Sequence, residues 1–312
     1  MNKPAPSIPG RRKPCGSALL LVMWAMVFMS LAVFGVVKFV AYGFDDTVAF
    51  QKDFRARQLA ESGLAIGLHP EVRAGDPVLQ QELPMNEKIK VRIRPEDGRL
   101  PINALLLYGH EDVLRDLFEQ WGLEPDDAAT VVDSLADWVD RNNRPRLRGA
   151  EREYYQEQGY PDYPRNKPFE SVDEMLPVRG MDKLAQVKPH WKDYFTVYGS
   201  GKLNVNGASA EAIAIYTKMT RDQAAALVRE RNGPDGIPDT EDDLQFTSLE
   251  QFRDLLGLNP IDFDTISPLL TVETTLIRVE SRGTAGGRTV RLSAIASREY
   301  GKRATVLAIM AN

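Results

Sequence analysis

The sequence predicts an α+β fold: a long N-terminal helix packs on a small antiparallel sheet, and a large, mostly helical insert interrupts that sheet domain. Three observations carry this prediction. A basic segment is followed directly by an uncharged apolar run, segments of alternating polarity occur both before residue 100 and after residue 270, and the residues between them show helical patterns.

The N-terminal apolar run is long enough to cross a membrane. Residues 16–37 carry no charge, and about 20 apolar residues are what a helix needs to span the hydrocarbon core. Basic residues precede the run and Asp45 and Asp46 follow it, so we expect a single-pass protein with a cytoplasmic N-terminus and its body on the outer side. A cleaved signal peptide and a simple uncleaved anchor are the alternatives. The run exceeds the 7–15 apolar residues usual in a signal peptide.

The helix is predicted to continue beyond the membrane. Residues 45–68 contain no proline, and the pattern stops at His69-Pro70. Together with the apolar run they would form one helix of roughly 50 residues, or about 75 Å. Ala56, Ala60, Gly63 and Gly67 recur at helical spacing, which either lets a sheet approach closely or reflects tolerance in a mobile stalk.

The predicted sheet draws strands from both ends of the chain. Residues 89–94 alternate strictly between apolar and charged side chains. Residues 276–281 and 289–295 flank a glycine-rich turn at 283–287 as further predicted strands, and 304–310 offer another. One sheet whose strands are separated by about 170 residues implies an inserted domain. A separate C-terminal hairpin is the alternative.

The insert contains an internal repeat. One unit opens at Leu100-Pro101-Ile102-Asn103 and the other at Leu203-Asn204-Val205-Asn206, and each is predicted to hold an Asn-started helix, a middle helix and a last helix. Ser171 and Ser248 are the predicted N-caps of the last helices, and Gly180 and Gly257 are predicted to end them. The units resemble helix-hairpin-helix modules.

The predicted division follows from these elements: residues 1–16 are a leader, 17–68 the membrane and stalk helix, 69–100 the first part of the sheet domain, 101–269 the insert with units 101–181 and 203–258, and 270–312 the completing strands.

The N-terminus resembles a prepilin-type cleavage junction. Arg11-Arg12-Lys13-Pro14-Cys15-Gly16 followed by Ser17-Ala18-Leu19-Leu20-Leu21-Val22-Met23-Trp24 is similar to the start of the K-class minor pseudopilins of bacterial type II secretion systems. The duplicated insert shares this resemblance, as do the stretches at 137–140 and 149–155. The resemblance implies a pilin-like sheet domain, cleavage between Gly16 and Ser17 by prepilin peptidase, methylation, and an inner-membrane protein with a periplasmic body.

Leu21 sharpens this resemblance. Most pilin-like subunits carry a glutamate at the fifth mature position, where it is thought to meet the terminal amine of a neighbouring subunit, and a carboxylate within the membrane is costly unless neutralised. This chain has Leu21 there. A subunit at the filament tip lacks that neighbour, so the resemblance implies a tip subunit. Its partners would be the other minor pseudopilins, prepilin peptidase and the inner-membrane secretion platform.

The charge of the chain disfavours the main alternative function. The leader holds four of the 39 basic residues and no acid, which leaves 35 basic against 44 acidic residues and a formal charge of −9. A membrane-anchored DNA receptor with helix-hairpin-helix units would instead need a basic surface for phosphates. At the two hairpins Asp182 and Asn259 also stand where such modules usually place a second glycine. We therefore expect no nucleic acid partner.

A cation site is predicted in the insert, with Ca²⁺ as the expected ion. Five carboxylates occur within nine residues, in a segment that Gly and Pro keep out of a helix: Asp235, Asp239, Glu241, Asp242 and Asp243. A solvated acidic loop is the alternative. The K-class resemblance implies calcium in this domain without fixing its ligands.

A second candidate cation site is Asp140, Asn142 and Glu151, although arginines are interspersed among these residues. The sequence offers no sign of catalysis. His69, His110 and His190 are at least 40 residues apart, and Gly199-Ser200-Gly201-Lys202 lacks the Ser or Thr that a phosphate-binding loop needs next. The protein is therefore not expected to be an enzyme.

Overall fold

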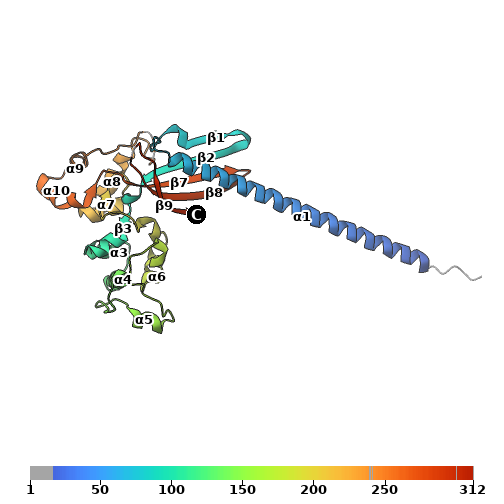
Figure 1. The fold of residues 1–312 in the computed structure, drawn as a ribbon, viewed down its shortest axis with the longest axis horizontal. Coiled ribbons are helices and arrows are strands. Elements are labelled where there is room, and N and C mark those ends of the chain that lie inside the picture. The colour runs from blue at the N-terminus through green and yellow to red at the C-terminus, as the bar shows by residue number, and fades with distance from the viewer. Residues whose placement is uncertain (1–16, 239, 241, 300, 312) are drawn as a thin grey trace, which may run out of the picture. The chain divides into compact units, whose positions relative to one another are not determined.

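The computed structural model describes residues 17–311 apart from 239, 241 and 300. Contacts divide the chain into two units, one ending at Arg55 and one beginning at Ala56 (Figure 1). The predicted α+β fold is confirmed. An apolar N-terminal helix, an antiparallel sheet and a helical insert are all present.

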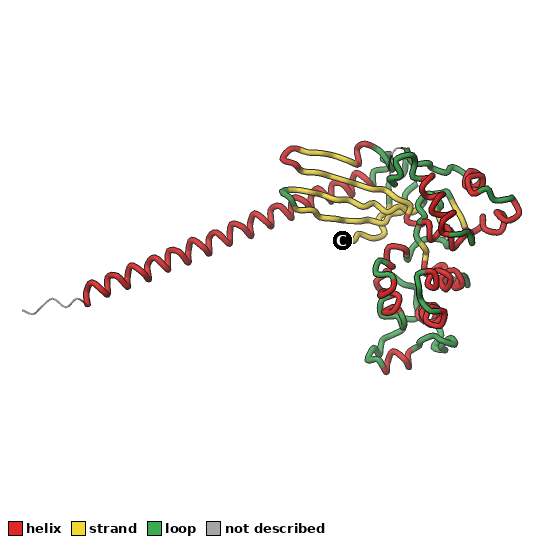
Figure 2. Tube along the Cα trace, turned by 180° about the vertical axis from the view of Figure 1, so that it is seen from behind, coloured by secondary structure: helices red, strands yellow, loops and turns green. Residues whose placement is uncertain are grey.

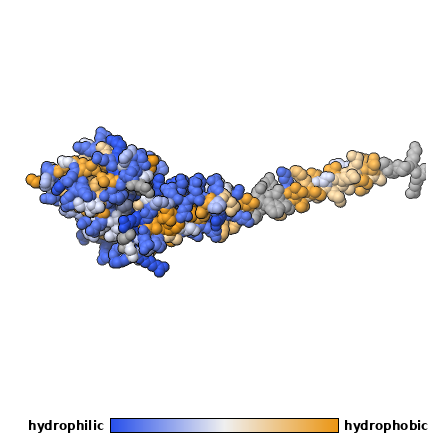
Figure 3. All heavy atoms as spheres, turned by 90° about the horizontal axis from the view of Figure 1, so that it is seen from above, coloured by the Kyte–Doolittle hydropathy of each residue, from blue (hydrophilic) through white to orange (hydrophobic). Residues whose placement is uncertain are grey.

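The N-terminal helix α1 runs over Ser17–Gly67, 51 residues, as the sequence predicts. Within the described residues, Ala18–Phe39 is the one helical segment long and apolar enough to cross a membrane. Its large apolar side chains are exposed, and Figure 3 shows them as a hydrophobic surface along this segment. A helical segment with apolar side chains on all sides, whose single charge is Lys38 next to its end, suits a lipid environment.

The second unit is built on a five-stranded antiparallel sheet with strand order β1-β2-β7-β8-β9. The strands are β1 (Gln80–Leu83), β2 (Glu87–Pro95), β7 (Leu276–Ala285), β8 (Arg288–Ser297) and β9 (Thr305–Ala311). Because β2 pairs with β7 along eight residue pairs, the two ends of the chain form one sheet rather than separate hairpins. Figure 2 shows these strands side by side.

The glycine-rich turn predicted at 283–287 is shorter in the structure, so its predicted bounds are wrong. Strand β7 continues to Ala285, and only Gly286 and Gly287 form the turn. Gly283 is needed within the strand because a Cβ there would lie 2.1 Å from the backbone oxygen of Ala56. Its missing side chain therefore makes room for α1.

The last turns of α1 pack closely on the sheet through small residues. Ala56 and Ala60 are fully buried. A Cβ on Gly63 would lie 2.2 Å from Ser281 Oγ, and one on Gly67 would lie 2.4 Å from Val279 Cγ1. The small residues at helical spacing are thus a contact surface for the sheet.

The insert holds the remaining helices and short strands. They are β3 (Leu100–Pro101), α2 (Ile102–Leu107), α3 (Glu111–Gln120), α4 (Pro125–Val139), α5 (Arg152–Glu157), α6 (Met181–Val187), β4 (Phe195–Thr196), β5 (Leu203–Asn204), α7 (Ala210–Thr217), α8 (Arg221–Arg231), α9 (Leu249–Leu256), α10 (Pro260–Ile266) and β6 (Leu270–Thr271). Short 3₁₀ turns lie beside the sheet strands at Pro77–Leu79, Pro84–Asn86 and Glu96–Gly98, and within the insert at Val172–Met175, Trp191–Tyr194 and Ser267–Leu269. Its buried apolar residues form a core separate from the one between α1 and the sheet.

Two asparagines show that the insert is duplicated. Asn103 donates to the carbonyl of Phe169 (2.9 Å) and accepts from its amide (2.8 Å). Asn206 makes the same pair with Phe246 (3.0 and 2.8 Å). Each unit is also closed by a two-residue parallel pairing, β3 with β4 and β5 with β6. The repeat therefore extends beyond the predicted units, to residues 196 and 271.

Three local predictions about the repeat are wrong. The Ser171 side chain makes no capping hydrogen bond, and the segment after it forms only a 3₁₀ turn. Gly180, with φ of 86°, precedes α6 instead of ending a helix, and α7 begins after Ser209, well beyond Asn206. Asn206 instead bonds to the backbone of Phe246, and Gly180 lies against Val131, where a Cβ would come within 2.8 Å of Val131 Cγ2. Ser248 and Gly257 cap α9 as predicted.

Candidate cation site and membrane segment

Three carboxylates meet where α4 ends and α5 begins. Asp137, Asp140 and Glu151 each offer an oxygen atom, and these three atoms lie within 4.8 Å of one another. It is the one such group of three or more acidic, histidine or cysteine side chains found in the part of the chain that the structure describes. The structure thus brings together two of the three residues of the second predicted site and adds Asp137.

The local fold explains this convergence. Asp137 and Asp140 are three residues apart at the end of α4, a spacing that places side chains on one face of a helix. Glu151 is the N-cap residue of α5, and Trp138 packs edge-on against Tyr155 with ring centroids 5.4 Å apart, which joins the two helices. The loop returns closely because Gly149 has no Cβ; one would lie 1.9 Å from Asp137 Oδ2.

Burial and mutual repulsion disfavour the ionised forms of the carboxylates in this cluster. Asp137 is fully buried and Glu151 is 4% exposed. Burial raises the pKa of Asp137 to about 6, and the charges of Asp140 and Asp133 add to this. Burial likewise raises the pKa of Glu151 to about 7, with further increases from Asp137 and Asp140. At neutral pH the ionised carboxylates therefore repel one another, and a bound cation would reduce this repulsion.

The three carboxylates of the cluster differ in the hydrogen bonds that they accept. The amide of Arg146 donates to both carboxylate oxygens of Asp137 (3.3 and 3.1 Å). Asp140 Oδ1 accepts from the backbone amide and the side-chain Nδ2 of Asn142 (2.9 and 2.7 Å). Both carboxylate oxygens of Glu151 are buried and accept no hydrogen bond within 3.5 Å from the described residues, and the adjacent Arg152 amide only partly offsets the effect of burial on the Glu151 pKa. Since buried carboxylates need donors or a cation, Glu151 is the residue that most requires a ligand.

The donor set fits a hard cation such as Ca²⁺, which binds carboxylate and carbonyl oxygens. Asn142 does not present its carbonyl to the group, because Asn142 Oδ1 accepts from the Arg144 amide at 2.7 Å. The sequence prediction did not include Asp137 among the candidate ligands. Its three-residue spacing from Asp140 was the available signal.

The structure describes the other predicted cation site, residues 235–243, only in part. Asp239 and Glu241 lie outside the described residues. Asp242 is held by local contacts: its Oδ2 accepts from the Asp235 amide (3.3 Å) and its Oδ1 from the Thr240 hydroxyl (2.7 Å). The Thr240 hydroxyl also lies 3.3 Å from Asp243 Oδ1. These contacts describe a hydrogen-bonded turn, with the Thr240 bond the main cause of a lowered pKa of Asp242.

The predicted processing site lies at the edge of the described chain. Gly16 lies outside the described residues, and Ser17 is the first residue of α1. Leu21 lies on α1 within the apolar segment and is 71% exposed. Its side chain is thus available to lipid or to a neighbouring helix.

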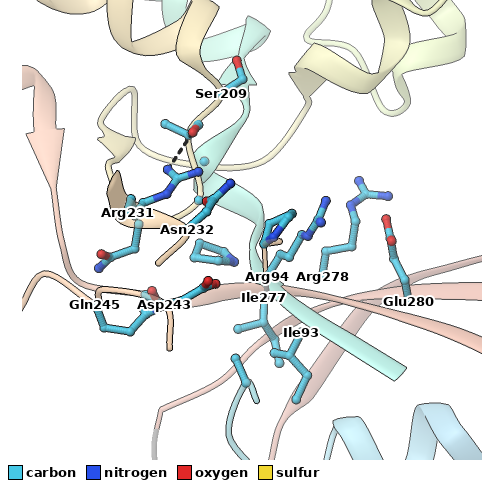
Figure 4. Close-up of a pocket in the computed structure, with 18 of the residues that line it drawn as sticks. Ile93, Arg94, Ser209, Arg231, Asn232, Asp243, Gln245, Ile277, Arg278 and Glu280 are labelled. Atoms are coloured by element: carbon cyan, nitrogen blue, oxygen red, sulfur yellow. Dashed lines mark hydrogen bonds between the residues drawn. The ribbon is translucent and has the colours of Figure 1, made fainter. Parts of the chain in front are cut away.

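A cavity of about 1060 Å³, whose lining includes several charged side chains, lies between the sheet and the insert (Figure 4). Arg278, from β7, forms two hydrogen bonds to the buried Glu96 (2.6 and 2.8 Å). Arg231, from α8, donates to the carbonyls of Val205 (2.9 Å) and Ala208 (2.7 Å). These arginines use their donors to join the elements around the cavity.

Comparisons with known proteins agree with this architecture. The family model described as type II secretion system (T2SS), protein K, matches residues 98–190, which include the carboxylate cluster. A curated type II secretion system protein K from Klebsiella pneumoniae is 39% identical over 66 residues; the match spans 21% of this chain and about a fifth of that protein.

A solved structure extends the similarity over most of the fold. It is the crystal structure of the GspK-GspI-GspJ complex from the enterotoxigenic Escherichia coli type 2 secretion system. The match has a TM-score of 0.61 and 18% identity, and it covers 88% of this chain and 99% of that one. The chain is thus similar to protein K of type II secretion systems, in sequence over residues 98–190 and in fold over most of its length.

Proposed function

We propose that the chain is a minor pseudopilin that is cleaved after Gly16, stays anchored by its apolar helix with its body in the periplasm, and caps the tip of a pseudopilus, helping to start its assembly. The observation that carries the proposal is the apolar α1, whose last turns pack on a five-stranded sheet that a large insert interrupts. Its role is structural, and no step of catalysis is assigned to it.

Two features support the position at the tip. The insert, roughly residues 101–269, is larger than the sheet domain, so a subunit carrying it would obstruct packing along a filament shaft. Leu21 replaces the membrane carboxylate that shaft subunits use to meet a neighbour. Both features are compatible with a subunit that has neighbours on one side only.

The proposed partners are the other minor pseudopilins. The solved structure with the same fold is a complex of GspK with GspI and GspJ, which supports partners of this kind. The test is detergent purification of the tagged full-length chain from cells that express the whole secretion system. We expect the other minor pseudopilins to co-purify in stable ratio. Purification of the chain alone, with those subunits present in the same membranes, would refute the proposed assembly.

The proposal includes one Ca²⁺ held by Asp137, Asp140 and Glu151, which would join the end of α4 to the start of α5. The unpartnered, buried Glu151 carboxylate supports it. Residues 235–243 remain a second proposed site. A ligand present at about 100 times its Kd stabilises a protein by about 2.7 kcal/mol. Calcium should therefore raise the Tm of the purified chain by about 5–10 °C over an EGTA-treated sample. An unchanged Tm would remove calcium from the proposal.

A further inference from the structure

The most exposed large apolar side chain recorded among the described residues is Leu147, in the loop between α4 and α5. It is 96% exposed, more than any of the lipid-facing residues recorded in α1. An isolated exposed leucine is common on protein surfaces. Leu147 differs because the backbone that carries it is fixed.

Both neighbours of Leu147 are tied to α4. The amide of Arg146 donates to the buried Asp137 carboxylate, and the amide of Arg148 donates to Asp133 Oδ2 at 3.1 Å. The Gly149 amide closes a turn on the Arg146 carbonyl at 3.1 Å. The loop thus presents Leu147 outward in one backbone conformation, which lowers the entropic cost of binding.

The arginines around Leu147 fall into two pairs with different roles. Arg146 pairs with Glu111 at 3.1 Å, and Arg148 pairs with Asp126 at 2.7 Å. Arg141 and Arg144 are exposed, and neither forms an ion pair with any residue that the structure describes. Arg141 and Arg144 precede Leu147 by six and three residues in the same loop, so a chain with a net charge of −5 carries two exposed cationic side chains and an exposed leucine within seven residues.

We propose that Arg141, Arg144 and Leu147, here called the Leu147 patch, are a docking surface for a second protein that presents an apolar recess bordered by carboxylates. The recess would take the leucine, and the carboxylates would pair with the arginines. An exposed leucine on a fixed backbone, preceded in its loop by two exposed arginines without ion pairs to the described residues, is complementary to that combination.

The position and size of the patch favour a protein over a membrane. In both Figure 1 and Figure 2, α5, which directly follows the loop, lies at the end of the insert remote from the sheet. Membrane binding strength scales with the apolar area buried, and one leucine with two arginines gives only weak, reversible adsorption. A shaped recess in a protein uses the same three side chains with higher specificity. The inference rests on the proposed role in secretion.

The test compares three variants of the full-length chain in cells that secrete through this system: Leu147→Asp, the double variant Arg141→Glu with Arg144→Glu, and Ile261→Asp. Ile261, 80% exposed on α10, is the matched control, because it places the same charge on another exposed part of the insert. Two quantities are measured: the amount of protein exported to the medium, and co-purification of the chain with the other minor pseudopilins. Co-purification tests the proposed function separately.

Loss of a buried leucine contact weakens binding by roughly ten- to a hundredfold. We therefore expect Leu147→Asp and the double arginine variant to lower export at least tenfold with co-purification unchanged, while Ile261→Asp exports normally. Normal export by both patch variants would overturn the inference. Loss of co-purification together with export would also overturn it, since the patch would then belong to the pseudopilin assembly.

A photo-cross-linker identifies the class of partner. With p-benzoylphenylalanine in place of Leu147, we expect an adduct with a protein segment of net negative charge, and the double arginine variant should reduce its yield. An adduct with phospholipid, or with a neutral or basic protein segment, would contradict the proposed chemistry.

Discussion

The contact between α1 and the sheet leaves no room for a methyl group at Gly63. A Cβ there would lie 2.2 Å from Ser281 Oγ and 2.9 Å from Ile89 Cγ2, far inside van der Waals contact. Overpacking of a core costs about 1–3 kcal/mol. Replacing glycine by alanine within a helix returns about 1 kcal/mol. Because the overlap is severe, Gly63→Ala should lower the free energy of unfolding by about 2 kcal/mol.

The assay is thermal unfolding of the full-length chain in detergent, followed by circular dichroism. For a domain of this size, 2 kcal/mol corresponds to a Tm decrease of about 4–8 °C. Ser62→Ala is the control, since Ser62 is the exposed neighbour of Gly63 and gains helix propensity without a clash. A Tm that rises in Gly63→Ala as it does in Ser62→Ala would refute the close packing and support a mobile stalk.

Ser281 allows a second check of the same contact. Its hydroxyl is buried without a hydrogen-bond partner, so Ser281→Ala alone should leave stability unchanged or raise it. The change also removes the atom nearest to the new methyl group. Gly63→Ala should therefore be less damaging in the Ser281→Ala background, with a coupling of about 1 kcal/mol. Strict additivity would show that the two residues do not touch.

Three further predictions concern the insert and its connection to the sheet. Asn103→Ala and Asn206→Ala should each cost about 2–3 kcal/mol by urea unfolding, because each leaves the two backbone groups of a phenylalanine unpaired; a neutral Asn206→Ala would contradict the structural repeat. Burial raises the pKa of Asp97 to about 7, so the folded state favours its neutral form and Tm should fall as pH rises from about 4 through 7. Asp97→Asn should make Tm less dependent on pH and should raise Tm at pH 8, where the free energy of unfolding would increase by up to roughly 4 kcal/mol. A variant with the wild-type dependence of Tm on pH would contradict this prediction. Glu151→Gln should abolish stabilisation by calcium, yet equal or exceed the wild-type Tm in EGTA because it removes a buried charge; a full calcium response in this variant would exclude Glu151 as a ligand.

The parts of the fold that the sequence predicts best are those with strong periodicity. The apolar run of α1, the alternation in β2 and the strand patterns of β7, β8 and β9 depend on local sequence, and the structure has these elements close to the predicted positions. The caps were harder to predict. Ser248 caps a helix but Ser171 does not, although both stand in the same Phe-x-Ser pattern, because only the second unit forms a full α-helix there.

Only part of the candidate cation site could be predicted from the sequence. Asp140 and Glu151 have the types and spacing of cation ligands. The role of Asp137 depends on burial against the returning loop, which requires Gly149 and the packing of Trp138 on Tyr155. Sequence spacing gives no measure of burial. The unpartnered state of Glu151, which distinguishes this cluster from an acidic surface loop, is likewise visible only in the structure.

The proposed pseudopilin subunit is released from its leader at the membrane. Intact-mass spectrometry of the protein purified from cells with active prepilin peptidase tests this processing directly. We expect a chain that begins at Ser17, carries a methyl group on its N-terminus and lacks Cys15. A chain that retains Met1 and the residues up to Gly16 in those cells would contradict it.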